Sequence, residues 1–180
     1  IKDDKTMNAF ALPGGKIAVY TGIFPVAKTE AGLAAVMGHE VVHALARHGG
    51  ERMSQNTLAQ TTLQAIGIAL GVSGANPVVS QGAMAALGVG AQVGVLLPFS
   101  RKHESEADYV GVLLAADAGY DPRESIQLWT RMGELSGGKS ASEFMSTHPS
   151  HETRIEQLEE WMSEAMPIYQ SKPPAPNNEL

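Results

Sequence analysis

The chain has 180 residues, of which 43% are hydrophobic, and this is enough to bury one substantial core in a single compact domain. A formal net charge of -6, without a Lys/Arg stripe interleaved with aromatic residues, argues against a nucleic-acid partner. The chain has no cysteine, which excludes disulfides, thiol nucleophiles and cysteine-bound zinc, so histidines and carboxylates remain to hold a metal. Because it begins at Ile1 rather than at a methionine, we expect a piece of a longer protein, with any signal or anchor outside it.

Residues 8–22 are typical of an antiparallel hairpin, because Pro13-Gly14-Gly15 separates two short strand-like runs. A strand buries one face and can offer its edge to an extended peptide, so a structural role and a binding role are compatible. The structural role places four apolar side chains in the core: Phe10, Leu12, Ile17 and Val19.

A helix is predicted from Glu30 to about His48, with Thr29 as its N-cap and Gly49-Gly50 at its end. It contains the motif His39-Glu40-x-x-His43, whose histidines lie on one face and can bind one Zn²⁺. The Glu40 carboxylate then lies beside the metal, where it can take a proton from the attacking water. The spacing predicts metal-assisted hydrolysis, and the alternative is a pair of surface histidines on an amphipathic helix.

Residues 57–97 are rich in Ala, Gly, Val and Leu and are divided by Asn76-Pro77, which predicts an apolar helical hairpin. Glutamines interrupt both arms, so neither reaches the roughly 18 to 20 apolar residues of a membrane-spanning helix. We expect the hairpin to pack on the domain or to cover the cleft, and contact with lipid is the alternative.

The next helix is predicted to begin at Ser100 as its N-cap. Glu104 and Asp108 share one face at positions i and i+4, and Gly111 continues that face without a side chain, so another helix can approach closely. A carboxylate here would complete a His₂Glu zinc site, and Asp108 is placed to accept the free ring N–H of a ligand histidine. Glu104 and Glu106 compete on spacing alone, and a solvated acidic helix start is the structural alternative.

The remaining segments are predicted to be scaffold. Asp121-Pro122-Arg123-Glu124 is typical of a capped helix start, and that helix is expected to end near Ser136-Gly137-Gly138. Ser150 is the predicted cap of a last helix with an apolar stripe. Residues 171–180 are proline-rich and polar, and we expect a tail or linker that does not pack.

Four motifs in this order resemble the HtpX and CAAX-prenyl-protease family of gluzincin zinc metallopeptidases. They are Asn8 to Gly15, His39-Glu40-x-x-His43, Ser100-Arg101-x-x-Glu104-x-x-Ala107-Asp108-x-x-Gly111, and Thr147-His148-Pro149-Ser150-His151-Glu152-Thr153-Arg154. The likeness covers about residues 8 to 160. Integral-membrane members of that family have clear spanning helices, so the chain is most similar to the soluble periplasmic members that act on outer-membrane proteins.

The resemblance implies that His39, His43 and Glu104 bind one Zn²⁺ per chain and that Glu40 is the general base. It favours Glu104 over Glu106 as the third ligand. Asp108 is implied to lie behind the ligands.

Three further roles follow from the same resemblance. His148 corresponds to a histidine close to the zinc, which either occupies the fourth position or helps to stabilise the oxyanion. Arg154 falls at the family's arginine and orients the site, and a surface ion pair is the alternative. The substrate strand is implied to consist of Asn8, Ala9, Phe10, Ala11 and Leu12.

The predicted fold is α+β and mostly helical, a zincin-like metallopeptidase domain over residues 1–170 with a small hairpin-containing sheet at the edge of a helical bundle. Its expected function is zinc-dependent cleavage of extended, unfolded or misassembled envelope proteins in the bacterial periplasm or at the membrane-associated envelope. The expected partner is a polypeptide substrate, with no nucleic acid and with a peripheral membrane or outer-membrane assembly contact. The alternative is a chaperone or adaptor that binds unfolded strands while a self-blocked zinc site holds cleavage off. A purely structural zinc fits poorly, because a closed site needs four protein ligands and no Glu40.

Overall fold

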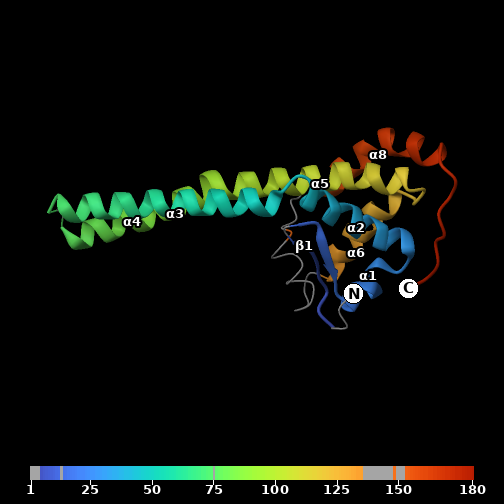
Figure 1. Cartoon of the computed structure of the whole chain (residues 1–180), viewed down its shortest axis with the longest axis horizontal. Helices are drawn as coiled ribbons and strands as arrows, with labels where there is room; N and C mark the ends of the chain where they lie inside the picture. The colour runs from blue at the N-terminus through green and yellow to red at the C-terminus, as the bar shows by residue number, and fades with distance from the viewer. Residues whose placement is uncertain (1–4, 13, 75, 136–147, 149–152) are drawn as a thin grey trace. The chain divides into compact units, whose positions relative to one another are not determined.

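A computed structural model describes residues 5–12, 14–74, 76–135, 148 and 153–180 of the chain. Over these residues the chain is mostly helical and has one two-stranded antiparallel sheet (Figure 1), which confirms the predicted α+β class. The chain divides into two compact units. The first consists of residues 1–47 and 103–180, and the second of residues 48–102.

The sheet of the first unit is the predicted N-terminal hairpin. Strands β1 (Ala9–Leu12) and β2 (Lys16–Val19) pair in antiparallel register, with Ala9 opposite Val19. Gly14 and Gly15 turn the chain with φ angles of 91° and 79°, a left-handed conformation that glycine adopts without a Cβ clash. Ala9 and Val19 are buried, but Leu12, expected in the core, is 45% exposed because it lies at the turn end of its strand.

Helix α2 (Glu30–Leu45) carries the His39-Glu40-x-x-His43 motif and begins as predicted. The Thr29 side chain accepts a hydrogen bond of 3.2 Å from the Gly32 N–H, which satisfies one of the free donors of the first turn. The 3₁₀ turn η1 (Thr21–Ile23) and the short helix α1 (Phe24–Ala27) connect the sheet to α2.

The end of α2 differs from the prediction. The helix stops at Leu45, and Arg47 adopts a left-handed conformation with φ of 59°. The reversal therefore comes before Gly49-Gly50, which belong to the first turn of the next helix, α3 (His48–Val72). The predicted end at His48 was wrong. The two glycines suggested the left-handed residue that ends a helix, but Arg47 adopts that conformation instead.

Three further helices complete the first unit: residues 103–117 of α5 (Leu97–Asp117), α6 (Arg123–Leu135) and α8 (Arg154–Gln170). Helix α2 lies against β1, α1 and α6, and α6 also packs on α8. The core that these elements share contains, among others, Ile23, Val26, Val36, Val112, Trp129, Met132 and Leu158. The predicted Ser150 cap of α8 lies outside the described residues.

The second unit is a helical hairpin in which α3 and α4 (Pro77–Ala91) lie side by side (Figure 1). The predicted break is confirmed, because the Asn76 side chain caps α4 by accepting from the Val78 N–H at 2.9 Å and Pro77 occupies the first helical position. Whether the hairpin packs on the first unit or covers a cleft stays a prediction.

The predicted helix start at Ser100 was wrong. Helix α4 continues through the π-helical segment η2 (Gln92–Leu96) into α5, so Ser100 lies inside a helix and its hydroxyl accepts a bond of 3.1 Å from Arg52. The resulting helix from Pro77 to Asp117 has a window with a mean hydropathy of 1.6 and, by length and composition, could cross a membrane. The expectation that no piece reaches spanning length was wrong because Gln92 does not interrupt the helix.

The C-terminal segment after α8 differs from an unpacked tail. Its backbone runs to the start of α2, where the Asn178 carbonyl accepts from the Glu30 N–H at 3.0 Å and the Asn177 side chain accepts from the Ala31 N–H at 3.0 Å. Thr29 and Glu179 form an isolated β-bridge. The segment thus satisfies donors of the first turn of α2 that Thr29 alone leaves unpaired.

Candidate metal centre

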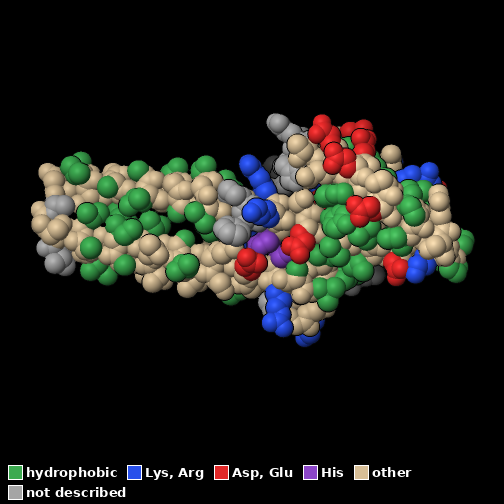
Figure 2. All heavy atoms as spheres, turned by 90° about the horizontal axis from the view of Figure 1, so that it is seen from above, with side chains coloured by type: hydrophobic (Ala, Val, Ile, Leu, Met, Phe, Trp, Pro, Cys, Tyr) green, Lys and Arg blue, Asp and Glu red, His purple; other side chains and the backbone are tan. Residues whose placement is uncertain are grey.

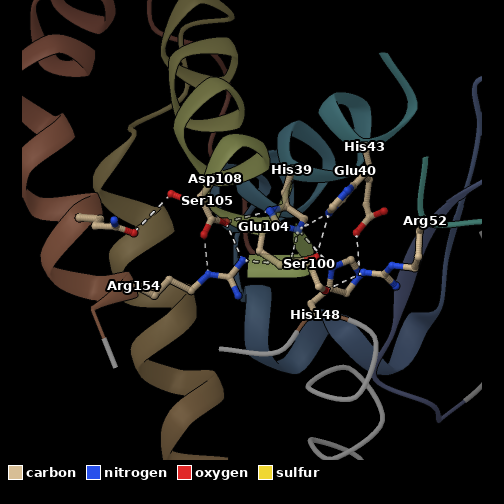
Figure 3. Close-up of polar contacts among 11 residues, drawn as sticks. His39, Glu40, His43, Arg52, Ser100, Glu104, Ser105, Asp108, His148 and Arg154 are labelled. Atoms are coloured by element: carbon tan, nitrogen blue, oxygen red, sulfur yellow. Dashed lines mark hydrogen bonds and ion pairs between the residues drawn. The ribbon is translucent and has the colours of Figure 1, made fainter. Parts of the chain in front are cut away.

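The two histidines of α2 point to the same place (Figure 3). They stand one helical turn apart, and their Nε2 atoms lie 2.9 Å from each other. His39 is buried and His43 is half-buried. Neither is a solvated histidine on a polar helix face, so the alternative of plain surface histidines does not describe these residues.

Glu104 reaches the same point from α5. Its side chain is fully buried at 0% exposure, with Oε2 3.3 Å from Nε2 of His39 and Oε1 3.5 Å from Nε2 of His43. Its competitor Glu106 is exposed. Although burial raises the pKa of Glu104, hydrogen bonds from His148 and His39 lower it well below its usual range, so the group is an anion.

Glycines bring α2 and α5 close enough for this meeting. A Cβ placed on Gly111 would lie 2.8 Å from the backbone nitrogen of His39, and one on Gly38 would lie 2.6 Å from the Gly111 carbonyl oxygen. The backbones therefore touch where the helices cross. The predicted close approach at Gly111 is confirmed, and Gly38 is its counterpart on α2.

His148 completes the cluster. Its Nδ1 lies 3.1 Å from Nε2 of His39 and 3.2 Å from Oε2 of Glu104, and its ring is buried. One ligand atom from each of His39, His43, Glu104 and His148 lies within 4.8 Å of the others. A tetrahedral Zn²⁺ with bonds of about 2.0 to 2.1 Å has ligands about 3.3 Å apart, close to the separations found here.

The donor set fits a metal in a second respect. Oε1 of Glu104 is buried and has no hydrogen-bond partner among the described residues. A buried carboxylate oxygen of this kind is costly unless a cation or a donor meets it. Two imidazole nitrogens and a carboxylate are ligands that zinc accepts, with His148 available as a fourth.

Asp108 fixes the orientation of His39. Its Oδ1 lies 2.8 Å from Nδ1 of His39, so Nδ1 is the donor and Nε2 faces the cluster (Figure 3). Burial lowers the pKa of His39, but the Asp108 carboxylate and Glu104 outweigh burial and raise it to about 9. A metal bound at Nε2 therefore displaces a proton from this ring.

Arg154, the first residue of α8, holds Asp108 from the other side. Its Nε donates to Oδ2 at 2.5 Å and its Nη2 donates to Oδ1 at 2.8 Å, a bidentate pair with the side chain only 2% exposed. Burial alone would raise the pKa of Asp108, but the neighbouring Arg154 and His39 lower the pKa by more than burial raises it. The carboxylate therefore stays ionised. The alternative of a surface ion pair is wrong for Arg154, because the pair is buried.

Trp129 on α6 belongs to this site, which the sequence did not reveal. The Arg154 guanidinium lies 3.3 Å from the centre of the indole ring, and His39 meets the same indole edge-on at 6.1 Å. The flat arginine stacks on the aromatic face and is held for its bond to Asp108. In the sequence Trp129 is one apolar residue of an amphipathic helix, and that pattern carries no sign of a polar partner.

Glu40 lies beside the cluster rather than in it. Its buried carboxylate faces the outer nitrogen of His148, with Oε1 3.2 Å from Nε2. Burial raises the pKa of Glu40, while His148, His39 and the Ala11 backbone lower it by less. A raised pKa brings a carboxylate closer to the range in which it can both accept and return a proton.

The Ala11 contact shows that β1 runs past the site. In the described part of the chain the sheet has two strands, so β1 has one edge that no strand covers. Ala9 and Asn8 are buried, while Phe10 and Ala11 are half-buried. The structure thus brings the predicted substrate strand, Asn8 to Leu12, to the side of α2 that carries Glu40.

The sequence matches Peptidase family M48 over residues 1–162. The chain belongs to this family. The family confirms the predicted gluzincin resemblance, and with the metal cluster it identifies an M48 metallopeptidase domain.

Curated relatives of this M48 domain come from two settings. It is 43% identical over 164 residues to "Mitochondrial metalloendopeptidase OMA1" of Schizosaccharomyces pombe. The aligned region covers 90% of this chain and 45% of the relative. It is 33% identical over 154 residues to "Putative beta-barrel assembly-enhancing protease" of Vibrio cholerae. That aligned region covers 84% of this chain and 32% of the relative. The chain thus spans less than half the length of these relatives. The relatives do not single out the periplasmic members that the sequence suggested.

Proposed function

We propose that this M48 domain is a zinc-dependent endopeptidase that cleaves extended segments of unfolded or misassembled envelope proteins. The observation that carries the proposal is the cluster of ligand atoms from His39, His43, Glu104 and His148, all within 4.8 Å of one another, with the Glu40 carboxylate beside it. When bound, Zn²⁺ would supply a Lewis acid for the scissile carbonyl and lower the pKa of a water molecule.

The side chains divide the remaining work. His39, His43 and Glu104 would hold the metal, and Asp108 with Arg154 fixes the ring of His39. Glu40 takes the proton of the attacking water and returns it to the leaving amine, for which its raised pKa is suited. The free edge of β1 binds the substrate backbone, and main-chain hydrogen bonds of this kind accept many sequences provided that the segment is extended. This last property supports unfolded proteins as the substrate class.

His148 closes the resting site in this proposal. Its Nδ1 would take the fourth metal position, and its Nε2 lies 3.2 Å from Oε1 of Glu40, so one ring would fill the place of the water and crowd the general base. Cleavage requires His148 to move away, which frees both at once. The second role considered for His148, stabilising an oxyanion, requires it to stay near the metal during the reaction.

Substitution of Glu40 by Gln tests the peptidase function. Glu40→Gln should reduce cleavage of unfolded casein by at least about a hundredfold, because general-base catalysis contributes about 10² to 10⁴. Zinc content, measured by atomic absorption, should stay at one ion per chain. Glu159→Gln on the exposed face of α8 is the matched control and should cleave normally. A Glu40→Gln protein that still cleaves casein would refute the general-base role.

A second candidate function, chaperone or adaptor, is favoured by the closed position of His148. It predicts that the Glu40→Gln protein still suppresses aggregation of an unfolded protein and still rescues an envelope-assembly defect in cells. Under the peptidase proposal the same substitution abolishes rescue. The two functions are therefore separated by one variant measured in two assays.

A further inference from the structure

The hairpin of the second unit has an unusual composition. Between Arg52 and Arg101 the chain has no Asp, Glu, Lys, Arg, His, Tyr or Cys, so no ionisable side chain lies on either arm beyond its base. The space-filling view shows the same absence, since the hairpin at the left of Figure 2 carries hydrophobic side chains without acidic, basic or histidine side chains towards its tip. Exposed helices of water-soluble domains ordinarily carry charged residues on the solvent face.

The hairpin also has no buried interior of its own. Of residues 49–102, none whose exposure the structure describes is buried. Large apolar side chains are instead exposed along both arms, including Ile68 at 70%, Val78 at 79%, Val79 at 68% and Val89 at 63%. Two helices without a core gain little from packing in water, so an apolar partner must stabilise this unit.

Several polar side chains of the hairpin bond to its own backbone. The hydroxyls of Thr57, Thr61 and Thr62 each donate at 2.8 Å to the carbonyl four residues earlier, and that of Ser73 donates to the Leu70 carbonyl at 2.8 Å. At the tip, the Asn76 oxygen accepts the bonds that cap α4. This arrangement lets backbone and hydroxyl groups enter a medium that offers no hydrogen bonds.

Polarity along α3 sets how far such a unit can enter a bilayer. Gln55, Asn56, Gln60 and Gln64 lie in its first two-thirds, whereas Ala65 to Val72 are apolar. This apolar end is about 12 Å long at 1.5 Å per residue, close to one leaflet of a hydrocarbon core that is about 30 Å thick. The Cβ position of Gly67 lies 3.7 Å from Met84, so the facing part of α4 enters with it.

Charge at the base of the hairpin favours an anionic lipid surface. Arg47, Arg52, Arg101 and Lys102 flank the arms against the single acidic Glu51, although the whole chain has a net charge of -6. These basic residues adjoin the ends of the charge-free segment in the sequence. Basic residues next to a membrane-inserted segment attract acidic lipid headgroups. A protein partner would not explain why the tip of the hairpin has no charge while its base is basic.

We propose that the α3–α4 hairpin is a monotopic membrane anchor whose distal part, residues 65–74 and 76–84, inserts into one leaflet of an anionic bilayer. The polar part of α3, up to Gln64, then lies at the headgroups with the basic residues. The anchor localises the peptidase to a membrane surface without a crossing of the bilayer, because α4 inserts together with the half-polar α3.

Flotation of the full chain with phosphatidylcholine–phosphatidylglycerol vesicles tests the anchor through lipid binding alone, independently of peptidase activity. The wild type should float with the vesicles, and Val79→Asp and Ile68→Asp should each lower the bound fraction by more than about tenfold. Leu135→Asp is the matched control, because Leu135 is a 46% exposed leucine of α6 outside the hairpin, and it should float normally. Circular dichroism melting establishes that each variant is folded.

Because the chain has no cysteine, a single introduced cysteine reports insertion depth through an environment-sensitive fluorophore. Val79→Cys and Ile68→Cys should shift to the blue with vesicles and be quenched by lipid-borne spin labels. Leu58→Cys near the base should respond less, and Glu159→Cys on α8 should not respond. A folded wild type that fails to float would overturn the anchor, and so would a tip fluorophore unaffected by vesicles. A lipid-independent dimer that Val79→Asp disrupts would assign the surface to a second copy of the chain instead.

Discussion

One imidazole ring lies close to two buried carboxylates: Nε2 of His148 lies 3.2 Å from Oε1 of Glu40, and Nδ1 lies 3.2 Å from Oε2 of Glu104. The distances place His148 between the proposed general base and the proposed third ligand. We expect a ring in this position either to close the site at rest or to take part in the reaction.

Substitution of His148 separates these roles. If His148 closes the site, His148→Ala should raise the rate of cleavage of an unfolded protein several-fold, because the fourth position and Glu40 become free. If it stabilises the oxyanion, the same change should lower kcat by about 10² to 10³. Steady-state kinetics on a short fluorogenic peptide measures either outcome, and zinc content should stay at one ion per chain. A fall in kcat would contradict the resting-closure role.

The choice of Glu104 as metal ligand is tested with a matched pair of variants. Glu104→Gln replaces a buried anion of the cluster and should weaken zinc binding by at least about tenfold, because carboxylate ligands bind the metal in the charged form. Glu106→Gln changes an exposed residue two positions later and should bind zinc like the wild type. Competition with a chelating dye gives both affinities. Equal zinc affinities of the two variants would rule Glu104 out.

Arg154 is expected to act as a positioning residue through Asp108. Arg154→Met leaves the Asp108 carboxylate buried without its bidentate partner and should destabilise the fold by about 3 to 5 kcal/mol. Arg154→Lys should not restore the wild-type value, since lysine cannot form the forked pair or stack on Trp129.

Zinc affinity distinguishes positioning by Arg154 from a purely structural role. Asp108→Asn should weaken zinc binding about 10- to 100-fold. Arg154→Met should weaken zinc binding by a larger factor in the wild-type background than in the Asp108→Asn background. Additive effects on zinc affinity would show that Arg154 does not act through Asp108.

The helix crossing at Gly111 is expected to be intolerant of any side chain. Gly111→Ala forces the backbones of α2 and α5 apart, because the new Cβ would lie 2.8 Å from the His39 nitrogen, so thermal unfolding should shift down by several degrees and zinc binding should weaken. Gly133→Ala on α6 is the control: its Cβ has no heavy atom within 4 Å, and better helix propensity should stabilise the protein by up to about 1 kcal/mol. Equal melting temperatures for the two variants would contradict a close crossing.

Local sequence was sufficient for the features that depend on a few neighbouring residues. The spacing of His39, Glu40 and His43 places two ligands and a base on one helix, Thr29 caps that helix, and Asn76-Pro77 ends one arm of the hairpin and starts the other. Each depends on contacts within about four residues, where helix geometry alone determines which side chains meet. The same locality explains the errors at Gly49-Gly50 and Ser100, where signals typical of helix ends were overridden by the conformation of Arg47 and by a helix that continues through η2.

Tertiary packing decided what the motif could not. His148 is 109 residues from His39 in the sequence, and only the fold brings its Nδ1 to 3.1 Å from Nε2 of His39. Packing of α5 against α2 buries Glu104 and leaves Glu106 exposed, while α8 delivers Arg154 to Asp108 and Trp129. The sequence by itself determined the ligand types and the hydrolytic chemistry of the α2 motif, because these follow from local helix geometry. The burial of Glu104, His148 and Arg154 at this one place depends on which distant surfaces exclude water together, and only the three-dimensional structure decides that.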